Sequence, residues 1–561
     1  MAKIYEIKKD YNYFLRTDEK LKSSGNLFSR ISLWQSALLN IKDKEVYKKL
    51  AELYRFADCS DYSAKYWYKY LDKAKEKDEK KQAYNGLGNA YFLLGNVRVS
   101  NYYLNNAFLI GGALDPDELD EEVVEYFASQ GETKGEYKIV YPPEKADYTS
   151  LLDDAKEDFL VGEIDEAISK YESVPKGSRF YSEAQAELSV VTFLKGDTDK
   201  AIEYSLNAVR ENGENILALC NLSSMYYVKD DLVNSRKYYD RAIKLTATDY
   251  NDLLKLAMAS CEQGEHLSAL KYFNKIEEEK PFDINIKYLT AVALYNLGEL
   301  NRARDKFFEA VTLKGGDVVI EQYIRVTDLA IERGLFGKKN NLKYFIQLPE
   351  DECKLNRKTL KDASLAPTSS LKNLLKKKEF RKVIDWAIWY GDSETAKTAV
   401  YILASSGLKW AKDKVVDLLL EVSISDYIKR VILTVLTIDG YSRPVGMVVG
   451  NVYSKSTLCP LNQEVDDKIL YSYAGCVSVL APVGVDDFSK VKKSAEKLSV
   501  INKDLLKEMD GPYLSAVITI KSKLKTVSEL KNVVKLFKVK EDLLKGYLTK
   551  IDKELQGENN D

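Results

Sequence analysis

Small and apolar residues recur at a fixed spacing between residues 148 and 317. A small residue returns at a constant interval, an aromatic or apolar residue follows it by four positions in all cases but one, and another small or apolar residue lies three further on. Side chains three and four residues apart share one face of an α-helix, so each period contains a helix that buries this face. The three sets are Ala167, Ala201, Ser235, Ala269 and Ala303; Tyr171, Ser205, Tyr239, Phe273 and Phe307; and Val174, Ala208, Ala242, Ile276 and Ala310.

A turn residue stands five positions before each of these small residues. Glycine and aspartate tolerate backbone angles that other residues avoid, so they suit a tight connection between two helices. The repeated unit is therefore expected to be a helix, a turn and a second helix. The turn residues are Gly162, Gly196, Asp230, Gly264 and Gly298.

The most complete unit runs from Tyr250 to Asp283, and it carries Pro281 near its end. On these residues, and on a period of about 34 residues, the sequence resembles the tetratricopeptide repeat. Further copies precede the five regular ones, one at about 44–77, one at about 80–108 and a degenerate one near Tyr11. The resemblance implies an all-α fold, in which helix pairs stack into a superhelix (an α-solenoid) with a concave groove.

The family resemblance also implies which side chains face the groove. This surface is apolar and aromatic with a few amides, and it suits a peptide that presents hydrophobic side chains. An open alternative is that another part of the same chain fills the groove. The expected partner-binding residues are Phe193, Leu217, Ser224, Tyr227, Leu254, Met258, Tyr288, Val292, Tyr295 and Asn296, and the resemblance also places Cys220, Asn251, Cys261 and Asn285 on the groove face.

The second half of the chain lacks this period. After a final unpaired helix at 318–333, apolar positions predict helices at Leu371–Tyr390, Ser393–Ser405, Leu408–Val422 and Ser425–Ile438, which resemble HEAT-type units. Residues 441–458 are rich in Val, Tyr, Ser and Thr and predict a small β-hairpin.

Seven segments follow from these patterns. They are an N-terminal tetratricopeptide-like arm (1–128), an irregular connection (129–147), the main array with its capping helix (148–334), a linker (335–369), HEAT-like helices (370–440), the β-hairpin (441–465) and a helical C-terminal domain with a helix-turn-helix-like tail of three helices (466–561).

The tail resembles a helix-turn-helix. Between residues 521 and 550 there are nine lysines and three acids, a local charge of +6, which meets the electrostatic condition for contact with phosphates. No arginine follows Arg443, although arginine is the usual reader of guanine. Trihelical units also serve as protein-docking modules. The candidate nucleic-acid residues are Lys531, Lys535, Lys538 and Lys545.

Composition and charge limit the classes of partner and of chemistry that we expect. The formal net charge of −2 removes any global argument for nucleic acid or membrane as the main partner. The six cysteines form no CxxC pair and the only histidine is His266, so we expect no metal site, no cofactor and no catalytic residue. The charged N-terminal segment lacks the apolar core of a signal peptide. We expect a cytoplasmic scaffold that binds a protein or peptide; the alternative is a regulator with a DNA-binding tail.

Overall fold

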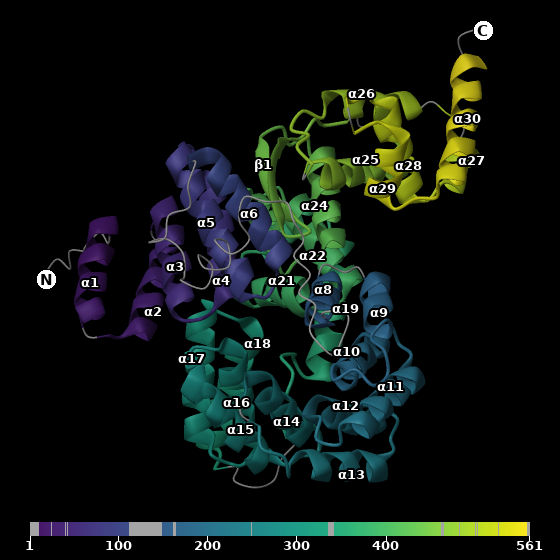
Figure 1. The fold of residues 1–561 in the computed structure, drawn as a ribbon. Coiled ribbons are helices and arrows are strands. Elements are labelled where there is room, and N and C mark those ends of the chain that lie inside the picture. The colour runs from purple at the N-terminus through teal and green to yellow at the C-terminus, as the bar shows by residue number, and fades with distance from the viewer. Residues whose placement is uncertain are drawn as a thin grey trace, which may run out of the picture. The chain divides into compact units, whose positions relative to one another are not determined.

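The computed structural model describes residues 10–111 and 148–557, apart from short gaps at 24, 40, 42, 161–163, 248, 335–340, 462–464, 482, 500, 502 and 526. The chain divides into two compact units, Met1–Ile346 and Gln347–Asp561, and each is described by itself. Both are helical, and the one sheet of the described residues is a two-stranded hairpin in the second unit (Figure 1). The all-α prediction with a small hairpin is therefore confirmed.

The first unit begins with three helix pairs. Helix α3 packs on α4 and α5 on α6, while α2 and α4 contact the pair that follows. The helix pair α1–α2 occupies the position of the degenerate copy predicted near Tyr11. The predicted connection 129–147 lies outside the described residues. The bounds are α1 Tyr11–Ser23, α2 Leu27–Ala37, α3 Lys44–Phe56, α4 Ser60–Lys73, α5 Lys77–Leu93 and α6 Val97–Gly111.

The main array continues the pattern of paired helices. The pairs are α8–α9, α10–α11, α12–α13, α14–α15 and α16–α17, and α18 closes the series. The bounds are α8 Tyr148–Leu160, α9 Ile164–Glu172, α10 Tyr181–Leu194, α11 Thr198–Glu211, α12 Ile216–Val228, α13 Leu232–Ala242, α14 Tyr250–Glu262, α15 His266–Glu279, α16 Ile284–Asn296, α17 Leu300–Lys314 and α18 Val318–Glu332.

The predicted packing and turn positions are confirmed. All five small residues of the period, from Ala167 to Ala303, are fully buried. The turn residues Gly196, Asp230, Gly264 and Gly298 have φ values between 60° and 93°, the left-handed region that a tight helix connection needs. Gly162 lies outside the described residues.

Capping residues add a second register with the same period. Asn215, Asp249, Asp283 and Asp317 each precede the first helix of a unit, and each side chain accepts a hydrogen bond from a backbone N–H of the first turn. These bonds satisfy donors that a helix leaves unpaired at its N-terminus. The helices α12, α14, α16 and α18 therefore begin at a capped position of the same period.

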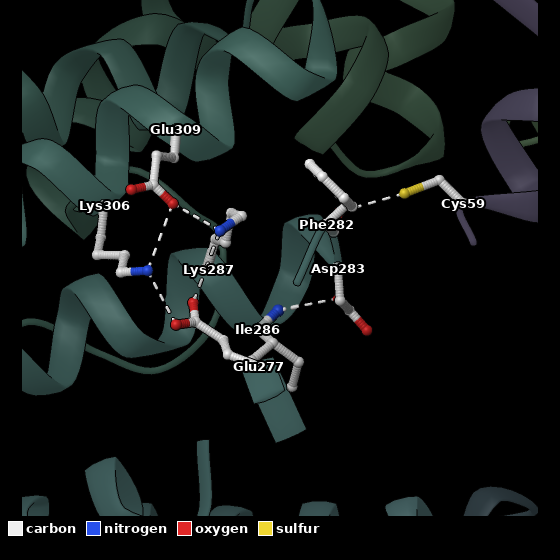
Figure 2. A network of polar contacts seen from close by, with 8 residues as sticks. All are labelled: Cys59, Glu277, Phe282, Asp283, Ile286, Lys287, Lys306 and Glu309. Atoms are coloured by element: carbon white, nitrogen blue, oxygen red, sulfur yellow. Dashed lines mark hydrogen bonds and ion pairs between the residues drawn. The ribbon is translucent and has the colours of Figure 1, made fainter. Parts of the chain in front are cut away.

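Ion pairs join neighbouring units in the array. Lys287 on α16 lies 2.5 Å from Glu309 on α17 and 3.9 Å from Glu277 on α15 (Figure 2). Lys306 completes the network at 2.9 Å from Glu277 and 3.3 Å from Glu309. Burial alone would raise the pKa of Glu309, but the two lysines more than offset it and lower that pKa. Three successive helices are thus tied together by alternating charges.

The second unit is also mainly helical. The bounds are α19 Glu350–Ser364, α20 Thr368–Leu374, α21 Lys378–Tyr390, α22 Ser393–Ser405, α23 Lys409–Asp417, the short 3-10 turn η2 Leu418–Leu420, α24 Asp426–Ile438, β1 Pro444–Val449, β2 Val452–Thr457, α25 Asp467–Leu480, α26 Ser489–Leu498, α27 Lys503–Glu508, α28 Gly511–Lys521, α29 Leu530–Phe537 and α30 Glu541–Gly557.

The predictions for two segments, a linker and a helix, need correction. The segment 335–369, predicted as a linker, contains helix α19, which buries Cys353, Leu360 and Ala363. The helix predicted at 371–390 is interrupted after Leu374, and α21 begins at Lys378. The guanidinium of Arg381 donates to the carbonyls of Leu375 and Lys376, which hold this break in place. The HEAT-type resemblance stays a prediction.

The hairpin follows its prediction. Strands β1 and β2 are antiparallel, and Val449 pairs with Val452 across a two-residue turn. Gly450 and Asn451 both have positive φ, 54° and 62°, as a type I′ turn requires. Among the described residues, no helix is both long and apolar enough to cross a membrane.

Candidate groove of the helical array

The first helices of successive units form a continuous layer. Helix α10 contacts α12, and α12 contacts α14. Six predicted partner-binding residues lie on this layer and keep solvent exposure. Tyr227 is 45% exposed, and the other five are partly buried. We call these six residues the open stripe: Phe193, Leu217, Ser224, Tyr227, Leu254 and Met258.

The next helix does not continue this open surface. On α16, Tyr288 and Val292 are fully buried and Tyr295 is 6% exposed. Tyr288 packs between Phe307 and Tyr323, with ring centroids 5.7 and 6.1 Å away. The expectation that these three side chains line an open groove is therefore wrong. Tyr288 is covered by Phe307 of α17 and Tyr323 of α18.

A segment of the same chain covers this end of the layer. Residues 341–346, which we call the strap, contact α16 through main-chain groups. The Asn296 side-chain amide donates to the Leu342 carbonyl at 2.9 Å, and its oxygen accepts from the Leu342 N–H at 2.7 Å. The Tyr288 hydroxyl donates to the Phe345 carbonyl at 3.2 Å. Asn296, predicted to bind a partner, thus binds the chain's own backbone.

Side chains of the strap alternate between two sides. Leu342, Tyr344 and Ile346 are partly buried, whereas Asn341, Lys343 and Phe345 are exposed. Every second side chain is thus partly covered, while the backbone bends at Tyr344, Phe345 and Ile346. The Tyr344 hydroxyl lies 2.8 Å from Nδ1 of His266, whose Nε2 lies 3.1 Å from the Asn341 amide nitrogen.

Polar side chains that the sequence analysis did not select lie beside the open stripe. The Ser224 hydroxyl donates to Glu262 at 2.6 Å, which joins α12 to α14. Burial raises the pKa of Glu187 and of Glu262, and the charge of Lys255 opposes the shift in both. Burial, followed by the charge of Asp249, raises the pKa of Asp252 to about 6.

A helical-wheel comparison of the first helices would have found these polar positions. Glu187 and Lys255 occupy the same place in their units, with one unit between them. Their pKa shifts come from tertiary burial, which a sequence pattern alone does not show. The groove layer therefore combines apolar side chains with carboxylates that lack full solvation.

The N-terminal arm contacts the far end of the array. The Cys59 thiol lies 3.2 Å from the Phe282 carbonyl, in the loop whose Asp283 caps α16 (Figure 2). Lys280 and Asp58 form an ion pair at 2.9 Å, and the Tyr54 hydroxyl donates to a carbonyl at the end of α17. Within the first unit, the arm thus meets the array through loop and helix-end groups, away from the open stripe.

The C-terminal lysines lie on the surface of the trihelical tail. Val533 and Phe537 bury the inner face of α29, while Lys531, Lys535 and Lys538 are exposed. Lys545 on α30 is also exposed and pairs with Glu541 at 2.6 Å. Helices α28, α29 and α30 contact one another, as a three-helix unit requires.

The side chains that could bind a metal ion, and the thiols, were compared over the described residues. Over the part of the chain that the structure describes, no group of three or more His, Cys, Asp and Glu side chains is placed to hold a metal ion. The six cysteines are free thiols, and five are buried. Burial raises the pKa of Cys220 to about 12, so this thiol next to the open stripe stays protonated.

Comparisons with known proteins give only distant likenesses. No protein-family model and no curated protein matches the sequence. Among solved structures, MamA is 23% identical, with 28% of this chain and 94% of MamA covered and a TM-score of 0.24. The APC/C hetero-tetramer Cut9–Hcn1 is 13% identical, with 58% and 57% covered and a TM-score of 0.29. Yeast Tom70 is 13% identical, with 97% and 99% covered and a TM-score of 0.22.

TM-scores this low carry no argument about arrangement or function. The repeat itself is visible in the chain's own geometry. Helix pairs return at a constant interval, their small residues are fully buried, and their turn and capping residues keep the same period. The chain is built around paired helices that repeat at a constant interval, as its resemblance to the tetratricopeptide repeat predicts.

Proposed function

We propose that this protein is a scaffold that binds a partner protein through a peptide segment lying along the open stripe. The observation that carries the proposal is the partial exposure of apolar side chains on three successive first helices, α10, α12 and α14. On α16, the equivalents of Leu254, Met258 and Tyr227 are the buried side chains Tyr288, Val292 and Tyr295, whereas the equivalent of Leu217, Asn285, is exposed. A ligand that covers an apolar stripe of this kind removes it from water, and this burial stabilises the complex.

Polar groups beside the stripe indicate the chemistry of the ligand. Glu187, Asp252 and Glu262 have raised pKa values because burial removes water from their carboxylates. A hydrogen-bond donor or a cation on the ligand would replace that lost solvation. The proposed ligand therefore combines apolar side chains with at least one donor group. We propose no catalytic role for these carboxylates and place the scaffold in the cytoplasm.

The test compares two matched double variants of the full chain. Leu254→Asp with Met258→Asp puts two charges into the open stripe, and Leu232→Asp with Val233→Asp puts two charges on exposed apolar positions of α13. Proteins that co-purify with the unmodified chain should be lost at least tenfold in the stripe variant and retained in the α13 variant. Equal retention by both variants would place the binding surface elsewhere.

The exposed lysines of α29 favour a second candidate function, contact between the tail and duplex DNA. Lysines without arginine would position the protein on phosphates and read few bases. The affinity of the full chain for a labelled duplex should fall steeply as the salt concentration rises, because each neutralised phosphate releases about 0.9 counterion. Lys531→Glu with Lys535→Glu should weaken binding to all duplexes alike, and absence of measurable binding at low salt would reject this candidate.

A further inference from the structure

The strap meets the array through contacts that a foreign peptide could make equally well. Asn296 binds both main-chain groups of one residue, Leu342, and Tyr288 binds the main-chain carbonyl of Phe345. Main-chain groups are the same in nearly every peptide, so these bonds recognise a peptide backbone and not a particular side chain. The strap is therefore bound in the manner of a ligand.

Side-chain contacts add selectivity to this backbone recognition. Leu342 and Tyr344 are two residues apart on the buried side of the strap. The Tyr344 hydroxyl meets His266 on α15, and the tyrosine and histidine rings lie 5.8 Å apart. Burial and the nearby Cys261 raise the pKa of Tyr344, so its hydroxyl is neutral and available to donate or accept.

We propose that the strap occupies the binding site of a partner's peptide segment, and that the partner must displace it. This inference rests on the proposed scaffold function and names its ligand class. The ligand is a peptide segment with an apolar residue where Leu342 lies, a tyrosine two residues later, and a main-chain N–H and C=O that pair with Asn296. A partner segment of this kind runs on from the α14 part of the open stripe to α16.

Displacement has a defined cost because the strap is tethered. A segment joined to its site by a short stretch of chain has an effective concentration in the millimolar range. A free peptide must therefore exceed that concentration or bind more tightly than the strap. Binding at this site is weak for single peptides and stronger for a partner that also covers the open stripe.

The test uses the capped peptide with the sequence of residues 341–346, carrying a fluorescent label, and the full chain. Leu342→Ala with Tyr344→Ala removes the two inward side chains and releases the strap. Lys343→Ala with Phe345→Ala removes two outward side chains as the matched control. We expect the released variant to bind the peptide at least tenfold more tightly than the unmodified chain, and the control to bind like the unmodified chain.

Asn296 provides the decisive second step. Asn296→Ala in the released variant should weaken peptide binding at least tenfold, whereas Asn285→Ala, at an exposed position of the same helix, should leave it unchanged. Equal peptide binding by the unmodified and released chains, or binding that ignores Asn296, would overturn the proposal. So would absence of peptide binding to the released variant.

Hydrogen exchange keeps the proposal testable if the released variant does not fold. In the unmodified chain the Leu342 amide is bonded to Asn296, so it should exchange slowly, and Asn296→Ala should accelerate it at least tenfold. Unchanged exchange would overturn the proposal. Peptide binding needs no natural partner, so a failed partner capture by the open stripe would reject the scaffold function and leave this result standing.

Discussion

Fully buried small residues fix the distance between paired helices. Ala269 on α15 has no exposed surface, and its equivalents in the other units are buried to the same degree. Interiors of this kind are close-packed, so an added side chain must displace its neighbours. The period of the repeat predicted these positions because each is a small residue between larger apolar ones on one helix face.

Ala269→Arg should destabilise the array by at least about 1–3 kcal/mol, since overpacking forces side chains and backbone to shift. The neighbouring Leu267 is 70% exposed, and Leu267→Arg should change the free energy of unfolding by no more than about 0.5 kcal/mol. Urea unfolding followed by circular dichroism checks both variants. Equal stability of Ala269→Arg and the unmodified chain would show that the repeat register is wrong.

His266 is a second residue whose surroundings set its chemistry. Burial penalises the imidazolium and lowers the pKa of His266 below 6.5, while Glu265 opposes the shift. The ring also contacts Tyr344 and Asn341 of the strap. Among the groups around it, the Tyr344 hydroxyl and the Cys261 thiol have pKa values raised by burial and stay neutral at acidic pH.

A lowered pKa means that the strapped form favours the neutral ring. Its contribution is present in full above pH 6.5 and is lost as the pH falls through the lowered pKa. Protection of the strap amides, relative to their intrinsic exchange rates, should therefore decrease on acidification. His266→Gln should remove this pH dependence. A protection that does not change with pH in the unmodified chain would show that His266 does not hold the strap.

At the scale of elements, capping residues fix where helices start, and ion pairs hold neighbouring units together. The asparagine and aspartates that cap α12, α14, α16 and α18 recur at a constant interval, whereas α10 begins after Phe180 without a side-chain cap. This second register could have been found from sequence. Helix α19 is harder to predict, because its 15 residues bury only Cys353, Leu360 and Ala363.

Lys287→Ala should destabilise the array by about 2 kcal/mol, because it leaves Glu277 and Glu309 with one lysine between them. This expected loss is smaller than the roughly 3–5 kcal/mol that breaking a fully buried ion pair costs, because Lys306 remains and Glu309 is partly exposed. Arg302→Ala breaks the exposed Arg302–Glu299 pair and should cost less than about 1 kcal/mol. Equal losses in urea unfolding would show that burial adds nothing to the network.

At the scale of the whole molecule, sequence periodicity predicts the repeat but not how its surface is used. The open stripe and the buried residues of α16 occupy equivalent positions in consecutive units, so a pattern treats them alike. Tyr288 is covered through contacts with Phe345 of the strap, Phe307 of α17 and Tyr323 of α18, which no pattern within one unit predicts. The strap lies 46 residues from its anchor Asn296, and no local pattern encodes that contact.

The central claim is that partners bind along the layer of first helices. Site-specific photo-crosslinking tests it most directly. A photoreactive amino acid is placed in turn at three stripe positions, Leu217, Leu254 and Met258. Two positions on the second helices of the units, Val233 and Leu267, serve as controls. The account predicts adducts with the same partner from the first three positions and none from the last two. Adducts from Val233 or Leu267 alone would contradict it.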